Sequence, residues 1–111
     1  MPMDGARAAW GHLFKAEDDT RLWQSGDEFK SAGAARDALD KLIGKASQVD
    51  KRGVKKDEKG HIVGKRVELV LRHGRKAAPD FVIAWTERSW LYRIRSTSLA
   101  LVLDFEDQCC H

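Results

Sequence analysis

The sequence predicts an α+β domain with two layers, in which an antiparallel meander of three or four strands is covered on one face by two helices. Alternating apolar and polar residues at 67–71 and 90–95 indicate strands, whereas apolar residues at helical spacing in 34–43 and 99–105 indicate helices. The connections between the consecutive strands are short. Parallel pairing needs a longer crossover, so we expect these strands to pair antiparallel.

The end of the chain carries the clearest pattern. Residues 81–86 are apolar and β-branched, residues 87–89 form a polar break, and residues 90–95 place large apolar side chains at every second position. Hydroxyl side chains at 96–98 then offer caps for a helix whose body is 99–106. We expect this helix to bury Leu99, Val102, Leu103 and Phe105 against the sheet.

A second helix is predicted in the middle of the chain. Ser31 is its candidate N-cap. The apolar stripe that follows consists of Ala34, Ala35, Ala38, Leu39, Leu42 and Ile43. Residues 48–60 are polar and are interpreted as a loop or a ragged hairpin tip. The strand at 67–71 comes next, and Gly64 ahead of it indicates a β-bulge.

The N-terminal segment, residues 1–20, has a weak pattern. Its apolar positions at 6, 9, 10, 13 and 14 have helical spacing, with a strand as the competing interpretation. Residues 21–24 would supply a fourth strand at an edge, and residues 107–111 are interpreted as a tail. A chain of 111 residues has the usual length of a single domain, so residues 1–111 are predicted to fold as one unit.

Composition and cysteine usage narrow the class of protein. No apolar run approaches the roughly 20 residues of a membrane span. The start of the chain lacks the apolar segment of ~7–15 residues that a secretory signal needs. We therefore expect a cytoplasmic protein that does not span a membrane. Cys109 and Cys110 are adjacent, which excludes a disulfide framework. With His111 they offer metal-binding groups, but we favour untethered, exposed thiols.

Charge is distributed unevenly along the chain. Residues 1–50 contain seven basic and nine acidic side chains, a net charge of −2. Residues 51–95 contain thirteen basic and five acidic side chains, a net charge of +8. Residues 96–111 contain three acids and no Lys or Arg. A basic middle between acidic ends suits nucleic acid, an acidic protein or a second copy of the chain.

Arginines dominate the predicted binding surface. The expected core face of the sheet holds Val67, Leu69, Leu71, Ile83, Trp85, Tyr92 and Ile94. The opposite face then presents four side chains to an anionic partner, namely Arg66, Arg72, Arg93 and Arg95. An ordinary solvated face, with arginines paired to Glu68, is the alternative interpretation. A secondary basic loop is expected to comprise Lys51, Arg52, Lys55, Lys56 and Lys59.

The aromatic residues are expected mainly in the core. Trp85 and Trp90 flank a turn, whereas Trp10 and Trp23 lie in the weakly patterned N-terminal third. Tryptophan buries a large apolar area, so packing is the favoured interpretation for all four. A docking arm for a partner is the alternative for the N-terminal segment that holds Trp10 and Trp23. Because the strand aromatics fall on the predicted core face, we do not expect an exposed platform on which RNA bases stack.

Motifs that carry chemistry are missing from the sequence. His12, His61, His73 and His111 are scattered, and no phosphate-loop or calcium-loop spacing occurs. We therefore predict no enzymatic activity, no catalytic or metal site and no cofactor. The predicted function is a small protein-binding module, acting as a regulator, an inhibitor or an assembly subunit. We expect a homodimer, because an unpaired edge strand and complementary charged segments favour self-association. The alternative is a nucleic-acid-binding accessory protein that uses the basic segment 51–95.

Overall fold

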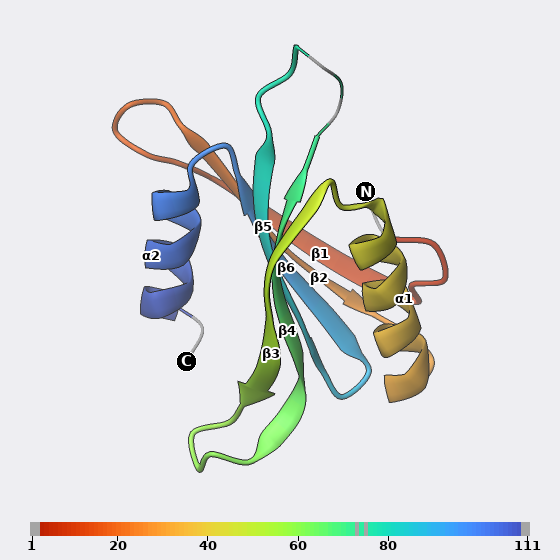
Figure 1. Ribbon diagram of the computed structural model, residues 1–111. Helices are drawn as coiled ribbons and strands as arrows, with labels where there is room; N and C mark the ends of the chain where they lie inside the picture. Colours follow the sequence, from red (N-terminus) through yellow and green to blue (C-terminus); the bar gives the residue numbers. More distant parts are fainter. Residues whose placement is uncertain (1–2, 73, 75, 110–111) are drawn as a thin grey trace.

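The computed structural model describes residues 3–72, 74 and 76–109, and it contains a six-stranded antiparallel sheet with one helix on each face (Figure 1). The elements, in chain order, are β1 (Ala8–Lys15), β2 (Arg21–Glu28), α1 (Ala32–Lys45), β3 (Gln48–Lys56), β4 (Ile62–Leu71), β5 (Asp80–Glu87), β6 (Trp90–Ser96) and α2 (Leu99–Cys109). The strand order across the sheet is β1-β2-β6-β5-β4-β3. The α+β class and the antiparallel pairing of the consecutive strands are confirmed. Of the helices in the described part of the chain, neither has the length and apolar character that crossing a membrane requires.

Two strands lie where the sequence pattern is weakest. β1 falls within residues 1–20, and β3 occupies most of the segment interpreted as a loop or hairpin tip. Both are edge strands, and both are mostly exposed on their two faces. A strand that buries neither face is under no pressure to alternate apolar and polar residues, so its pattern carries little signal. For this reason the predicted sheet was too small. The strand predicted at 21–24 is the first half of β2, which lies between β1 and β6 rather than at an edge.

Helix α1 forms for the reasons that its sequence indicates. The Ser31 side chain accepts a hydrogen bond from the Ala34 N–H at 3.0 Å, which satisfies one of the unpaired donors at the helix start. Lys45 lies in the last turn, where a cation complements the helix dipole. The buried stripe comprises Ala35, Ala38, Leu39 and Leu42. These side chains pack on β4, β5 and β6 and form one half of the core.

The prediction that both helices cover one face is wrong, because α1 and α2 lie on opposite sides of the sheet and make a three-layer structure (Figure 1). The cause is the register between β4 and β5. Val67 is paired with Ala84, and paired residues point to the same face, here the α1 side. Ile83 and Trp85, the neighbours of Ala84 along β5, therefore point to the α2 side. The core beneath α2 comprises Leu22, Ile83, Trp85, Ile94 and Val102.

Gly64 marks a close approach of β4 to β5. A Cβ atom at this position would lie 1.7 Å from the carbonyl oxygen of Thr86, so any side chain would push the two strands apart. The register of β3 against β4 shifts beside this glycine, between Lys55 and Lys56. The irregularity that the sequence predicts at Gly64 is present.

Helix α2 buries fewer of its apolar side chains than its sequence predicts. Val102 is fully buried, whereas Leu99 and Leu103 are exposed and Phe105 is half-buried. The prediction that Leu99 and Leu103 are buried is therefore wrong, since α2 packs mainly on the central strands β5 and β6 and its flanks remain open. The helix also continues to Cys109, so residues 107–109 are not a tail. Cys110 and His111, which complete the predicted tail, lie outside the described residues.

The burial difference along α2 gives a direct test of its packing. We expect Val102→Ala to lower the free energy of unfolding by about 2 kcal/mol, because it deletes two buried methyl groups and leaves a void. Leu103→Ala is expected to cost less than about 1 kcal/mol, because Leu103 is 38% exposed. Urea melts of the two variants measure both values. An equal loss for the two variants would show that α2 is rotated relative to this packing.

Candidate functional site

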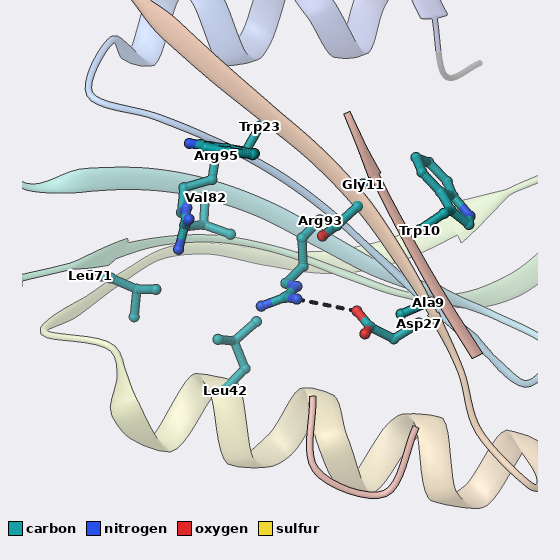
Figure 2. Close-up of a pocket in the computed structure, with 11 residues that line it drawn as sticks. Ala9, Trp10, Gly11, Trp23, Asp27, Leu42, Leu71, Val82, Arg93 and Arg95 are labelled. Atoms are coloured by element: carbon teal, nitrogen blue, oxygen red, sulfur yellow. Dashed lines mark hydrogen bonds and ion pairs between the residues drawn. The ribbon is translucent and has the colours of Figure 1, made fainter. Parts of the chain in front are cut away.

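The four arginines of the predicted binding surface do not share a face. Arg66 points to the α2 side, where it contacts Glu106 of α2, whereas Arg93 and Arg95 point to the α1 side (Figure 2). Arg72 follows the end of β4 and is exposed. The prediction that the four arginines lie on the sheet face opposite the helices fails because the alternation of β4 was aligned with that of β6 in the wrong phase. Only Arg93 and Arg95 stay together, two residues apart on β6.

Arg66 connects α2 to the sheet. Its guanidinium donates to both carboxylate oxygens of Glu106, at 2.6 and 2.8 Å, and to Glu68 at 2.8 Å. The hydrogen bond to Glu106, followed by that to Glu68 and the charges of both acids, raises the pKa of Arg66 against the opposing effect of burial. This arginine is engaged by two internal carboxylates, so its role is to hold the C-terminal half of α2 on β4.

The secondary basic site is an edge strand and its turn rather than a loop. Lys51, Arg52, Lys55 and Lys56 lie on β3, and Lys59 lies in the turn that leads to β4. β5 pairs with β4 only from Arg66 to Leu71, so the outer part of the β3–β4 hairpin is a two-stranded ribbon that extends beyond the sheet (Figure 1). The described contacts hold one basic side chain of this ribbon against the sheet: Lys55, whose Nζ lies 4.8 Å from the centre of the Trp85 ring.

A cavity of about 560 Å³ lies between α1 and the sheet, beside the strands that α1 leaves uncovered (Figure 2). Leu42 of α1 forms its floor in this view, and the guanidinium groups of Arg93 and Arg95 point toward it. The Trp10 side chain points away from the cavity, so that residue contributes its backbone only. The remaining apolar lining comes from Trp23, Leu71 and Val82.

A buried ion pair fixes one of the two cavity arginines. Asp27 is only 1% exposed, and one of its oxygens accepts a hydrogen bond from an Arg93 terminal nitrogen at 3.2 Å. Its other oxygen accepts from the Met3 N–H at 3.1 Å. The Nε–H of Arg93 is buried and has no acceptor among the described residues. Sequence reasoning missed Asp27, because an acid next to Ser25-Gly26 at the end of a short strand resembles an exposed turn residue.

Arg95 is held more loosely than Arg93. Its side chain is 41% exposed, and its Nε lies 3.9 Å from an Asp80 oxygen, at the outer limit of an ion pair. In the β2–β6 register it lies directly opposite Trp23, which is also exposed. The prediction of core packing is therefore wrong for Trp23. The indole and the guanidinium together form the outer wall of the cavity.

The edge strand β1 differs from every other strand, because each of its residues is exposed. Residues 8–14 contain no Lys, Arg, Asp, Glu or Pro, and the pairing with β2 runs without a register shift. The other edge, β3, carries four basic residues and two register shifts. Charges and bulges are the devices that keep sheet edges from pairing with other chains. β3 has both of these devices, whereas β1 has no register shift and carries its one formal charge, Lys15, at its last residue.

The backbone of β1 presents a row of unpaired groups. The Ala16 N–H donates to the Thr20 carbonyl at 2.8 Å, in phase with the β1–β2 register. Bonded and non-bonded pairs alternate in an antiparallel ladder, so the even-numbered residues of β1 direct their N–H and C=O groups to β2. The odd-numbered residues Ala9, Gly11 and Leu13 direct theirs to the open edge.

An aromatic row runs along the α2 side of β1. Trp10, His12 and Phe14 follow one another with ring centres 5.6 and 6.2 Å apart. Trp10 lies over Gly26, where a Cβ atom would meet the indole at 2.5 Å. The prediction of core packing is wrong for Trp10 as well. Trp10 and Phe14 are both exposed because β1 is an edge strand, although the Phe105 ring of α2 lies 5.1 Å from that of Phe14.

The row continues inward across the sheet. Tyr92 lies 6.3 Å from Trp10 and stacks on both Trp85 and Trp90, at 5.5 and 5.9 Å. Burial, with a smaller effect of the Glu87 carboxylate, raises the pKa of Tyr92. These rings join the exposed edge to the core beneath α2, so β1 is supported from one side by stacked aromatic groups.

The burial of the Asp27–Arg93 pair leads to a prediction about the stability of the folded chain. Arg93→Met removes the cation but leaves Asp27 buried, and breaking one side of a buried pair costs about 3–5 kcal/mol. Arg72→Met, a matched change at an exposed arginine, is expected to stay within about 0.5 kcal/mol of the unsubstituted chain. Urea melts compare the two variants. A loss below about 1 kcal/mol for Arg93→Met would show that water screens Asp27.

Comparison with known proteins gives no independent guide to this site, since no protein-family model, curated protein or solved structure matches the chain. Among the described residues, no three His, Cys, Asp or Glu side chains gather as ligands for a metal ion. The described residues present three surfaces: a regular sheet edge at β1, a basic ribbon at β3–β4, and a cavity with two guanidinium groups.

Proposed function

We propose that this chain is a small, non-enzymatic protein-binding module whose contact surface is the open edge of β1. The observation that carries the proposal is the contrast between the two edges of one sheet: β3 is charged and irregular, whereas β1 is regular and has no formal charge from Ala8 to Phe14. A strand that adds to β1 would gain main-chain hydrogen bonds with the outward groups of Ala9, Gly11 and Leu13. The side chains on either face of β1 would supply the specificity.

A second copy of the chain is the partner that the charges of β1 favour. In an antiparallel β1–β1 pair, Arg7 at the start of each strand approaches the far end of the other. That end carries the acidic turn Glu17-Asp18-Asp19, so the ends are complementary. The resulting C2 dimer would join two six-stranded sheets into one continuous sheet. The regulatory, inhibitory or assembly role expected of the module then depends on this association.

The backbone phase and the charges select one register for that dimer. The outward N–H and C=O groups of one β1, which belong to odd-numbered residues, must face those of the other β1. Two odd residue numbers add to an even number, so the two-fold axis passes through a residue and not between residues. An axis through Gly11 would set Arg7 opposite the partner's Lys15, and like charges in facing positions are destabilising. An axis through His12 avoids this repulsion and sets Trp10 opposite the partner's Phe14. We therefore place His12 on the axis.

Cysteine cross-linking tests the dimer and its register together. In a background with Cys109→Ser and Cys110→Ser, His12→Cys should form an interchain disulfide under mild oxidation. The reason is that directly opposite, non-bonded residues have Cα atoms about 4.5 Å apart, within the range that a disulfide spans. Gly11→Cys should cross-link poorly, since its equivalent in the partner is displaced along the strand. Efficient linking through Gly11 instead would reject this register.

Light scattering of edge variants tests the strand addition itself. Leu13→Lys places a charge on β1 and should convert the dimer to a monomer. Val54→Lys, a matched change at an exposed apolar residue of the β3 edge, should leave the dimer intact. A monomeric mass for the unsubstituted chain at high micromolar concentration, with reductant present, would exclude the second copy as partner. If a different protein partner is then isolated, and Leu13→Lys binds it with the same affinity as the unsubstituted chain, β1 is not the contact surface.

Nucleic-acid binding is the second candidate function, and the β3–β4 ribbon is the observation that favours it. Two-stranded β-ribbons fit the major groove of DNA. If the ribbon binds phosphates, duplex DNA affinity should fall steeply with salt. The triple change of Lys51, Lys56 and Lys59 to Gln should flatten that slope by about 0.9 per lost phosphate contact. The control triple Lys30, Lys41 and Lys45 to Gln removes the same charge near α1. Equal effects of the two triples in a fluorescence-anisotropy titration would assign binding to net charge rather than to the ribbon.

A further inference from the structure

The cavity beneath α1 has a size and lining that the strand-addition function does not use. Its volume, about 560 Å³, falls within the roughly 300–1,000 Å³ of small-molecule sites. Sites of that kind are mostly apolar, with a few polar groups that fix the ligand's orientation. Here the apolar walls come from Leu42, Leu71, Val82 and Trp23, and the convergent polar groups include Arg93 and Arg95 (Figure 2).

Arg93, one of these polar groups, has a buried N–H donor without an acceptor among the described residues. Asp27 orients the Arg93 guanidinium through one terminal nitrogen, and the Met3 backbone holds Asp27 in turn. The buried Nε–H of Arg93 finds no acceptor among the described residues. A buried donor without an acceptor is unfavourable, so a ligand oxygen that reaches this N–H would be stabilised there.

The second polar group supplies charge at the cavity mouth. Alternate residues of a strand point to the same side and lie about 7 Å apart, which places Arg95 next to Arg93 above the same space. Arg95 is half-exposed and its contact with Asp80 is long. It can therefore turn to a ligand at a small cost, whereas Arg93 stays fixed.

The charge balance and the walls define the chemical class of the ligand. Arg93 is paired with Asp27, and Arg95 lies near Asp80. A doubly charged phosphate would therefore be repelled by two nearby carboxylates. A single carboxylate needs less positive charge and matches the planar guanidinium. The apolar walls then require an apolar remainder. We propose that this cavity binds a small organic acid that has one carboxylate and an apolar body.

A titration series tests the site on the full chain. Octanoate is the probe, and octanamide is its neutral control with the same apolar body. Binding is followed by isothermal calorimetry and by the backbone amide shifts of Ser25, Arg93 and Arg95. We expect octanamide to bind at least tenfold more weakly, about the effect of one charge-assisted hydrogen bond. Equal binding of the two compounds would overturn the carboxylate site, as would tighter binding of inorganic phosphate.

Matched variants separate the cavity from general charge. Arg95→Gln should weaken octanoate binding about tenfold, whereas Arg72→Gln, at an exposed arginine outside the cavity, should not. Arg93→Lys keeps a cation beside Asp27, so that the chain still folds, but removes the Nε donor and should also weaken binding. Unchanged affinity in both cavity variants would overturn the proposal. N-acetyl-leucine, which resembles the end of a protein chain, identifies the source: tighter binding than octanoate would assign the carboxylate to a chain terminus.

Discussion

The burial of β5 and β6 on both faces is the constraint on which the rest of this structure depends. Both strands carry large apolar residues toward α1 and toward α2, including Val82 and Leu91 on one side and Ile83 and Ile94 on the other. A strand that is apolar on both faces must be covered twice. One helix therefore packs on each side, and the chain places the first helix in its middle and the second at its end. Both sit over the centre of the sheet, because that is where the apolar area lies.

This central cover leaves the margins of the sheet open. β1 and β3 are the edges of the sheet, each two strands from the central pair β6–β5. The helices pack mainly over that centre, although Phe105 of α2 reaches Phe14 of β1. Most residues of the two edge strands are exposed, where solvent or another chain can reach them. The margins also differ chemically: β3 is charged and irregularly paired, whereas β1 is regularly paired and has no formal charge over residues 8–14. The proposed contact surfaces at β1 and the β3–β4 ribbon thus lie where packing does not dictate the sequence.

Polar groups inside the sheet are used to attach its outer parts. The Arg93–Asp27 pair joins β6 to β2 and receives the N-terminal backbone at Met3, while Arg66 joins β4 to the end of α2. Removing such charges from water is costly, and the mutual attraction largely offsets that cost rather than adding net stability. What these pairs contribute is a defined geometry. The guanidinium that secures β2 also lines the cavity, so the attachment of β2 and the proposed ligand site share one side chain.

The local elements follow from the sequence by itself, because their signals are local. Ser31 and the stripe from Ala35 to Leu42 determine α1, and the short connections of β4, β5 and β6 determine their antiparallel order. Only the tertiary structure decides how Val67 aligns with Ala84, since a shift of one residue exchanges the faces and both faces of β5 are apolar. With this alignment, Arg66 lies on the α2 side of the sheet and Arg93 lies on the α1 side. The role of Asp27 and the exposure of β1 likewise depend on which strands become neighbours, a long-range outcome that no single segment encodes.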